Sequence, residues 1–201
     1  MTEAKILLFN KWDLSGVQVN DPGLRRYINL NAVVIPKTSG RYSTKFAHKN
    51  KINIVERFIN KLAVPGHKGK KHKLTSGHAV GRYQSLAKSV KEAFEIIEKK
   101  TGQNPVQILV KAIENGALHE EVMGYRVGGI IARKAVVTSP QRRVDVALRL
   151  IAQNIFTVAF KNRKALPQVI AEQLIEIANN DPRNPVIQER HRIEKEAEGA
   201  R

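Results

Sequence analysis

The residues whose types and spacing best predict a chemical role are five cations between Val122 and Val144, a window that contains no acidic residue. They are Arg126, Arg133, Lys134, Arg142 and Arg143. The last two follow a Ser-Pro pair typical of a helix start, where backbone amides carry partial positive charge. Two cations at such a place cost ~0.3–1 kcal/mol each unless an anion lies beside them. Free helix N–H groups and guanidinium forks together bind phosphate, so the sequence predicts a phosphate site here.

A second basic cluster lies in the stretch GHKGKKHK, which supplies Lys68, Lys70, Lys71 and Lys73. It is not a phosphate-binding nucleotide loop, because the G-x-x-x-x-G-K-[ST] spacing is absent. Glycine permits close approach and lysine supplies point charge, so we expect a clamp on a nucleic-acid backbone, with a flexible linker as the alternative. The histidines of this region do not predict a metal site, since lysines surround them and carboxylates are missing. These histidines are His67, His72 and His78.

The remaining candidate binding residues are single cations elsewhere in the chain: Arg82, Arg149, Lys161, Arg163 and Lys164. Four aromatic residues near the N-terminus could stack on RNA bases, although packing in a core is an equally good explanation. They are Trp12, Tyr27, Tyr42 and Phe46. Ser139 is explained as a helix cap, and no nucleophile elbow surrounds it. We therefore expect no enzyme, no cofactor and no metal.

The charge of the chain predicts a polyanionic partner. The 201 residues include 35 Lys and Arg against 18 Asp and Glu, a net charge of +17. Residues 1–91 hold 18 basic and 4 acidic residues, a net charge of +14, and residues 92–201 hold 17 and 14, a net charge of +3. No basic amphipathic helix dominates this charge, so nucleic acid is favoured over a membrane surface.

The absence of cysteine excludes disulfides, thiol catalysis and thiolate metal sites. The N-terminus lacks the features of a secretory signal, and no apolar run approaches the ~18 residues of a membrane span. We expect a soluble cytoplasmic protein.

Apolar periodicity predicts the elements that must position these residues. Residues 1–50 show no lasting helical period, so we expect an extension that becomes ordered only against a partner. Helices are expected from residue 51 to the VPG at 64–66, from 83 to 101, from 105 to 116, from 140 to 159, from 167 onward and from 185 onward. The helix that follows Ser139-Pro140 has the longest apolar stripe, which predicts the central helix of the core.

The residues around Gly128-Gly129 interrupt this helical series and predict a tight β-hairpin, because two glycines accept the positive φ angles of a two-residue turn. In that register Arg126 faces Ile131, Arg133 lies on the same face and Lys134 points to the other. A hairpin alone is marginal in water, so it either protrudes as an arm or packs its base on the helices. The alternative to a binding role is that the charged residues only keep the edge of the hairpin solvated.

The predicted fold is mostly α, with one helical-bundle domain of about six helices, a protruding β-hairpin arm and an extended basic N-terminal extension. Residues 1–50 form the extension, draped on RNA or protein. Residues 51–180 form the helical core, with the hairpin at about 120–138. Residues 181–201 form a C-terminal helix and tail.

Several stretches resemble the ribosomal protein S seven family, the universal small-subunit family. They are EIIEKKTGQNPVQILVKAIENG, YRVGG followed by AVVTSPQRRVDVALRLI, and AEQLIEIA, and the resemblance runs from about residue 51 to 180. FNKWDLSGVQVNDPGLRRYI and SGRYSTKF are similar to the N-terminal extension of the archaeal and eukaryotic branch.

The resemblance implies a structural, RNA-binding protein of the ribosome. The partner it implies is the three-prime major domain of small-subunit ribosomal RNA, where the protein organises assembly of the subunit head. It also implies a hairpin near the exit-site tRNA and the messenger path, beside protein S eleven, and a protein that is part of the ribosome rather than a homo-oligomer. Carried over to this sequence, the family's basic sites fall on Arg126, Arg133, Arg142, Arg143 and Lys68 to Lys73, with the hairpin tip at Gly128 and Gly129.

One feature departs from the family pattern, because the C-terminal helix of the family is usually rich in lysine. Here ERHRIEKEAEGAR holds four cations and four carboxylates. Protein contact or a solvated tail is therefore as good an interpretation of this helix as RNA contact.

Two other functions stay open: a basic helical DNA-binding or architectural protein, and an RNA-modifying enzyme, although the latter lacks a nucleophile, a metal site or a cofactor loop. We also expect that replacing Arg142 and Arg143 together with alanine weakens RNA binding without unfolding the protein.

Overall fold

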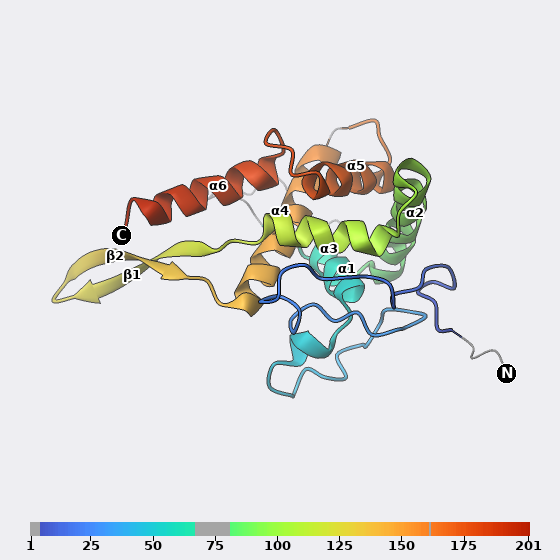
Figure 1. The fold of residues 1–201 in the computed structure, drawn as a ribbon, viewed down its shortest axis with the longest axis horizontal. Helices are drawn as coiled ribbons and strands as arrows, with labels where there is room; N and C mark the ends of the chain where they lie inside the picture. Colours follow the sequence, from blue (N-terminus) through green and yellow to red (C-terminus); the bar gives the residue numbers. More distant parts are fainter. Residues whose placement is uncertain (1–4, 67–80, 161) are drawn as a thin grey trace.

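The computed structural model describes residues 5–66, 81–160 and 162–201, and these form helices with one two-stranded antiparallel sheet (Figure 1). The helices are η1 (His48–Lys51, a 3-10 helix), α1 (Ile54–Ala63), α2 (Tyr83–Thr101), α3 (Pro105–Gly116), α4 (Pro140–Ala159), α5 (Leu166–Ala178) and α6 (Pro185–Glu198). The strands are β1 (Glu120–Val127) and β2 (Ile130–Val137). This architecture confirms the predicted, mostly α fold with a hairpin arm. In the described ranges, no helix combines the length and apolarity that crossing a membrane requires.

Most helix ends lie where the capping residues predict them. The side chains of Asn53, Asn104 and Asn184 each accept a hydrogen bond from the backbone N–H two residues later, which satisfies an otherwise free donor of the first turn. Gly102 ends α2 with a φ of 66°, as glycine permits. Because Asn53 is the N-cap, α1 begins three residues later than predicted, after the short helix η1.

Ser139 is the N-cap residue of α4, as predicted. Its hydroxyl forms no cap hydrogen bond. Pro140 follows it in the first turn, and the backbone carbonyl of Ser139 accepts from the N–H of Arg143 at 2.9 Å. The fixed φ of proline and this backbone bond therefore define the start of α4.

Helix α4 is the central helix of the core, as its apolar stripe predicts. It packs against α1, α3, α5 and α6, while α5 also covers α2 and α3. Its residues Ile151 and Ile155 are fully buried, together with Phe58 of α1 and Phe94 of α2. These contacts set α1 and α4 side by side, and the candidate site lies between them.

The N-terminal segment, which the sequence predicted to become ordered only against a partner, packs on the helical core of the same chain. Leu8, Trp12 and Leu24 are buried in the same core as the helices. The indole N–H of Trp12 donates to Glu98 of α2 at 3.0 Å, and its ring meets Phe94 edge-on at 5.6 Å between centroids. Packing is thus the role of Trp12.

The backbone of this segment is held by side chains of α3 instead of by a strand ladder. The N–H groups of Gln18 and Asn20 donate to Gln107 and Glu114 at 2.8 and 2.6 Å. An irregular chain that is bonded in this way buries apolar residues without any regular spacing, so periodicity could not reveal it.

The hairpin has the predicted register and turn. Arg126 pairs with Ile131, and Gly128 and Gly129 have φ angles of 57° and 94°. The base of the hairpin packs on α6, and its tip projects away from the helices (Figure 1). The arm therefore both protrudes and has a supported base.

The C-terminal helix and tail contact the hairpin of the same chain. The N–H of Ala135 in β2 donates to the carbonyl of Ala200 at 3.2 Å, and Arg201 donates to both carboxylate oxygens of Glu120 at 2.7 Å. Of the interpretations left open for this helix, intramolecular protein contact agrees with the structure.

Candidate nucleic-acid interface

The two arginines at the start of α4 have carboxylate partners within the chain. Arg142 forms a fork on Glu121 of β1, with Nε and Nη2 at 2.5 and 2.6 Å from its two oxygens. Arg143 donates from Nη2 to Asp21 at 2.8 Å and from Nε to the carbonyl of Leu118 at 3.0 Å. The anions that accompany this helix start are therefore Glu121 and Asp21.

Burial separates the roles of these two arginines. The side chain of Arg143 is 11% exposed, whereas that of Arg142 is 52% exposed. Burial opposes ionisation of Asp21, but the N–H of Gly23 and the guanidinium of Arg143 outweigh it and lower the pKa of this carboxyl. Arg143 is a structural residue that ties the N-terminal segment to α4, which corrects the prediction that both arginines can be removed without harm to the fold.

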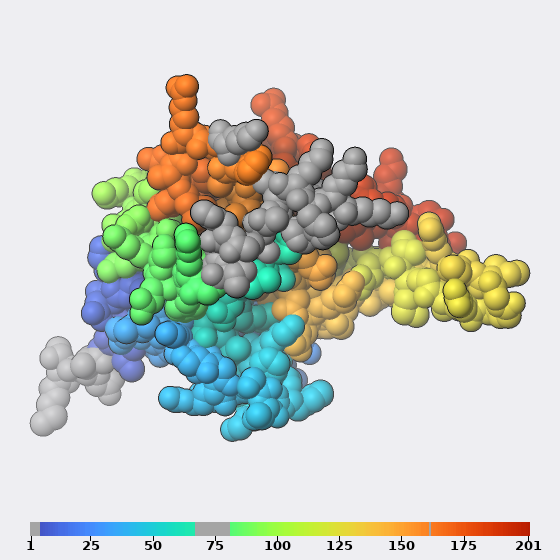
Figure 2. Space-filling view, turned by 180° about the vertical axis from the view of Figure 1, so that it is seen from behind, coloured from blue at the N-terminus to red at the C-terminus, as the bar shows by residue number. Residues whose placement is uncertain are grey.

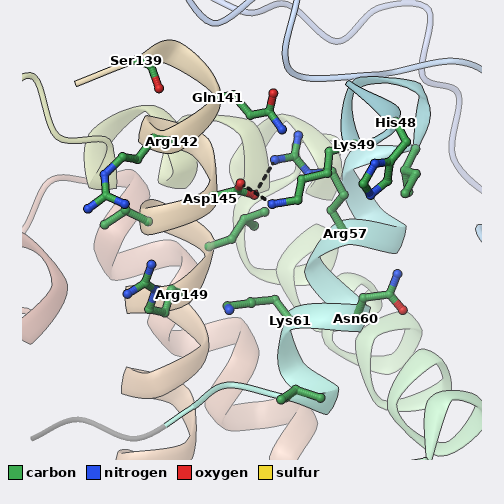
Figure 3. Close-up of a pocket in the computed structure, with 14 residues that line it drawn as sticks. His48, Lys49, Arg57, Asn60, Lys61, Ser139, Gln141, Arg142, Asp145 and Arg149 are labelled. Carbon is green, nitrogen blue, oxygen red and sulfur yellow. Dashed lines mark hydrogen bonds and ion pairs between the residues drawn. The ribbon is translucent and has the colours of Figure 1, made fainter. Parts of the chain in front are cut away.

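A groove of about 730 Å³ lies between α1 and α4, and its lining is mainly basic and polar (Figure 3). Helix α4 supplies one wall, and η1 with α1 supplies the other. The charged residues that line it are Lys49, Arg57, Lys61, Arg142, Asp145 and Arg149. Within the described parts of the chain, five cations thus meet a single carboxylate there.

Asp145 organises one end of the groove. It accepts from Lys49 at 2.7 Å and from Arg57 at 3.0 Å, and Arg57 also donates to the carbonyl of Tyr27 at 2.8 Å. Burial alone would raise the pKa of Asp145, but the hydrogen bond from Lys49 and the charge of Arg57 hold it below its ordinary value. Asp145 is therefore ionised near neutral pH and fixes both cations in place.

Lys61 and Arg149 lie at the other end of the groove, where no carboxylate of the described residues forms a salt bridge with them. Figure 3 shows Lys61 extending from α1 toward the part of α4 that carries Arg149. Burial and the nearby Arg149 lower the pKa of Lys61. A bound phosphate would offset this repulsion, because an anion between two cations favours their charged forms.

The hairpin presents cations on both faces. The register places Arg126 and Arg133 on one face of the sheet and Lys134 on the other. All three are exposed, as are the tip glycines Gly128 and Gly129. The arm thus extends the basic surface beyond the start of α4.

The structure does not gather all predicted residues at one place. Arg163 and Lys164 follow the C-terminal end of α4, and the 20 residues of this helix put them ~30 Å from the hairpin base. Lys164 pairs with Glu172 at 2.7 Å, and Arg82 is exposed at the start of α2. The other predicted cations and the histidines lie outside the described residues: Lys68, Lys70, Lys71, Lys73, Lys161, His67, His72 and His78.

The groove itself was missed by the sequence prediction, apart from Arg142 and Arg149. Lys49, Lys61 and Asp145 belong to segments far apart in sequence, so no local spacing joins them. One signal was present: Arg57 lies among the apolar residues of a helix, and a buried arginine requires a partner. Its partner Asp145 is the first acid after the acid-free window.

Comparison with known proteins relates the chain to a family of ribosomal proteins. Residues 24–201 match the family described as ribosomal protein S7p/S5e. The chain is 44% identical to the small ribosomal subunit protein uS7 of Nanoarchaeum equitans, over 98% of this chain and 100% of that relative. The proteins of the same name from Cenarchaeum symbiosum and Archaeoglobus fulgidus are each 42% identical, over 98% and 100% of this chain and 97% of each relative. The similarity therefore includes the hairpin and both walls of the groove.

Proposed function

Because this chain belongs to the ribosomal protein S7p/S5e family, we propose that its groove and hairpin arm bind the RNA of the small ribosomal subunit. As a member of this family the chain is a ribosomal protein and not an enzyme. This membership also decides against a DNA-binding architectural protein and an RNA-modifying enzyme.

The observation that supports the groove as a binding surface is the pair Lys61 and Arg149. The other three cations of the groove have carboxylate partners in Asp145 and Glu121, so their charge is largely compensated. The positive charges of Lys61 and Arg149 are not compensated in this way. A helical RNA exposes phosphates that two such cations can bind. Phosphate contacts of this kind set the position of the protein on RNA, while shape and unpaired bases supply specificity.

The finer parts of the proposal follow from the resemblance to the family. The RNA partner is the three-prime major domain of small-subunit ribosomal RNA, and binding there organises assembly of the head. The hairpin arm lies near the exit-site tRNA and the messenger path, beside protein S eleven. The protein acts in the cytoplasm as part of the ribosome. The projection of the hairpin tip away from the helices supports a long reach toward such partners (Figure 1).

Binding to a refolded three-prime major domain fragment and to a scrambled RNA of equal length, each over a potassium chloride series, tests the proposal. We expect tight binding that survives salt only for the first RNA. Replacing Lys61 and Arg149 together with alanine should weaken binding and reduce the slope of log affinity against log salt by about 2, one for each phosphate that is no longer neutralised.

The matched control replaces Lys111 and Arg183 with alanine, because these are also one lysine and one arginine, both exposed and both outside the groove. This variant should bind like the unmodified protein. Equal weakening in the two variants would show that the groove is not the interface. Equal affinity for the two RNAs in the unmodified protein would show that only charge is recognised.

A further inference from the structure

Phe46 is the most exposed large apolar side chain among the described residues, with 99% of its surface open to solvent. It belongs to the segment 38–51, which projects from the lower edge of the molecule in light blue (Figure 2). Trp12, by contrast, is buried in the core. An aromatic ring held fully in water is unfavourable unless a partner covers it.

The segment that carries Phe46 is fixed at both ends. At its start, the N–H and the hydroxyl of Thr38 donate to the buried carboxylate of Glu56 at 2.8 and 2.7 Å. At its end, Lys49 pairs with Asp145, and the carbonyl of Asn50 accepts from the side chain of Asn29 at 3.2 Å. The ring is therefore presented by an anchored loop and not by a free chain end.

Successive tight turns shape the loop between these anchors. The N–H groups of Ser43 and Lys45 donate to the carbonyls three residues earlier at 2.9 and 3.0 Å. Ala47 adopts a φ of 51°, a left-handed conformation that is unfavourable for a residue with a side chain. The backbone thus turns at the residue that follows Phe46.

The surroundings of Phe46 are cationic. Arg41, Lys45 and Lys51 are exposed, and none of them forms a salt bridge with a carboxylate of the described residues. The segment 38–51 contains no acidic residue. Such a segment repels cationic partners and attracts a polyanion, so an exposed aromatic ring within it suits a nucleic-acid base better than an apolar protein surface.

The loop is also continuous with the groove. His48 and Lys49 line the groove, and the Cα of Phe46 lies at most ~7 Å from that of His48, two residues away. The residue that carries the ring therefore lies next to the lining of the groove.

We propose that Phe46 is a stacking platform for an unpaired base of the bound RNA, with Arg41, Lys45 and Lys51 holding the phosphates that flank it. This inference rests on the proposed function, since it requires that the groove binds RNA. Aromatic rings stack on any base, so Phe46 contributes affinity for an unpaired nucleotide without selecting its identity.

Three substitutions of Phe46 test the proposal on the same refolded RNA fragment. Phe46→Ala removes the ring, Phe46→Leu keeps an apolar side chain that cannot stack, and Phe46→Trp keeps an aromatic ring. We expect Phe46→Ala and Phe46→Leu to bind roughly 5- to 150-fold more weakly, since stacking of one base contributes ~1–3 kcal/mol. Phe46→Trp should retain the affinity of the unmodified protein, and its new indole emission should be quenched by RNA while that of the buried Trp12 is not.

The salt series separates this proposal from the proposed function. Removal of a stacking ring leaves the number of bound phosphates unchanged, so Phe46→Ala should lower affinity without changing the salt slope. Unaltered affinity of Phe46→Ala, while the Lys61 and Arg149 variant is weakened, would overturn the stacking role alone. Retention of affinity by Phe46→Leu would also overturn it, because it indicates an apolar contact. Absence of specific binding in the unmodified protein would overturn both proposals.

Discussion

Two adjacent arginines at the start of α4 should respond very differently to the same substitution. Arg143→Met keeps the length of the aliphatic stem and removes the charged donors to Asp21 and to the carbonyl of Leu118. Each hydrogen bond with a charged partner contributes about 1.5–3 kcal/mol. Because the side chain of Asp21 is 26% exposed, water replaces part of the interaction with Arg143, and we expect a total decrease of about 3 kcal/mol in the free energy of unfolding.

Arg142→Met is the matched control. The side chain of Arg142 is half exposed in its ion pair with Glu121, and exposed ion pairs contribute about 0.2–1 kcal/mol. For a domain of this size 1 kcal/mol corresponds to about 2–4 °C in melting temperature. Thermal unfolding followed by circular dichroism should therefore show a decrease of about 6–12 °C for Arg143→Met and less than about 4 °C for Arg142→Met. Similar decreases in the two variants would refute the assignment of Arg143 as a buried structural tie.

Two further predictions concern the groove and the hairpin. Asp145→Asn should destabilise the protein by about 2 kcal/mol at neutral pH, because it leaves the buried Arg57 without its counter-charge. Since the folded pKa of Asp145 is below its ordinary value of 3.8, its contribution is present above about pH 3.8 and is lost as the pH falls through the folded pKa. Urea unfolding from pH 7 to pH 2.5 should thus show the two proteins converging, and a difference that stays constant would contradict the pairing. Gly129→Ala, at a φ of 94°, should speed amide exchange at the hairpin tip without changing the melting temperature. The control is Gly16→Ala, where a new Cβ meets no atom within 4 Å and φ is ordinary, and it should change neither the amide exchange nor the melting temperature. Unaltered amide exchange at the hairpin tip of Gly129→Ala would rule out backbone strain at this position.

The resemblance and the charge together predicted the class of function, and the hairpin and helix boundaries followed from short stretches of sequence. Local capping by Asn104 and Asn184 and the Gly128-Gly129 turn involve only a few neighbouring residues, so they can be recognised without the fold. The burial of Leu8 and Trp12 could not be predicted in this way, since these residues lie in an irregular segment that side chains of α2 and α3 hold in place.

The sequence by itself determined which segments are helical, where the hairpin turns and that the chain carries a large excess of positive charge. Only the tertiary structure decided which cations are free to bind a partner. Arg143 meets Asp21 across 122 residues, and Lys49 meets Asp145 across 96, so neither pair is visible in a local window. The physical reason is that helices and turns are specified by contacts between residues close in the sequence. The compensation of a charge instead depends on which side chains the packing of α1 against α4 brings within hydrogen-bonding distance.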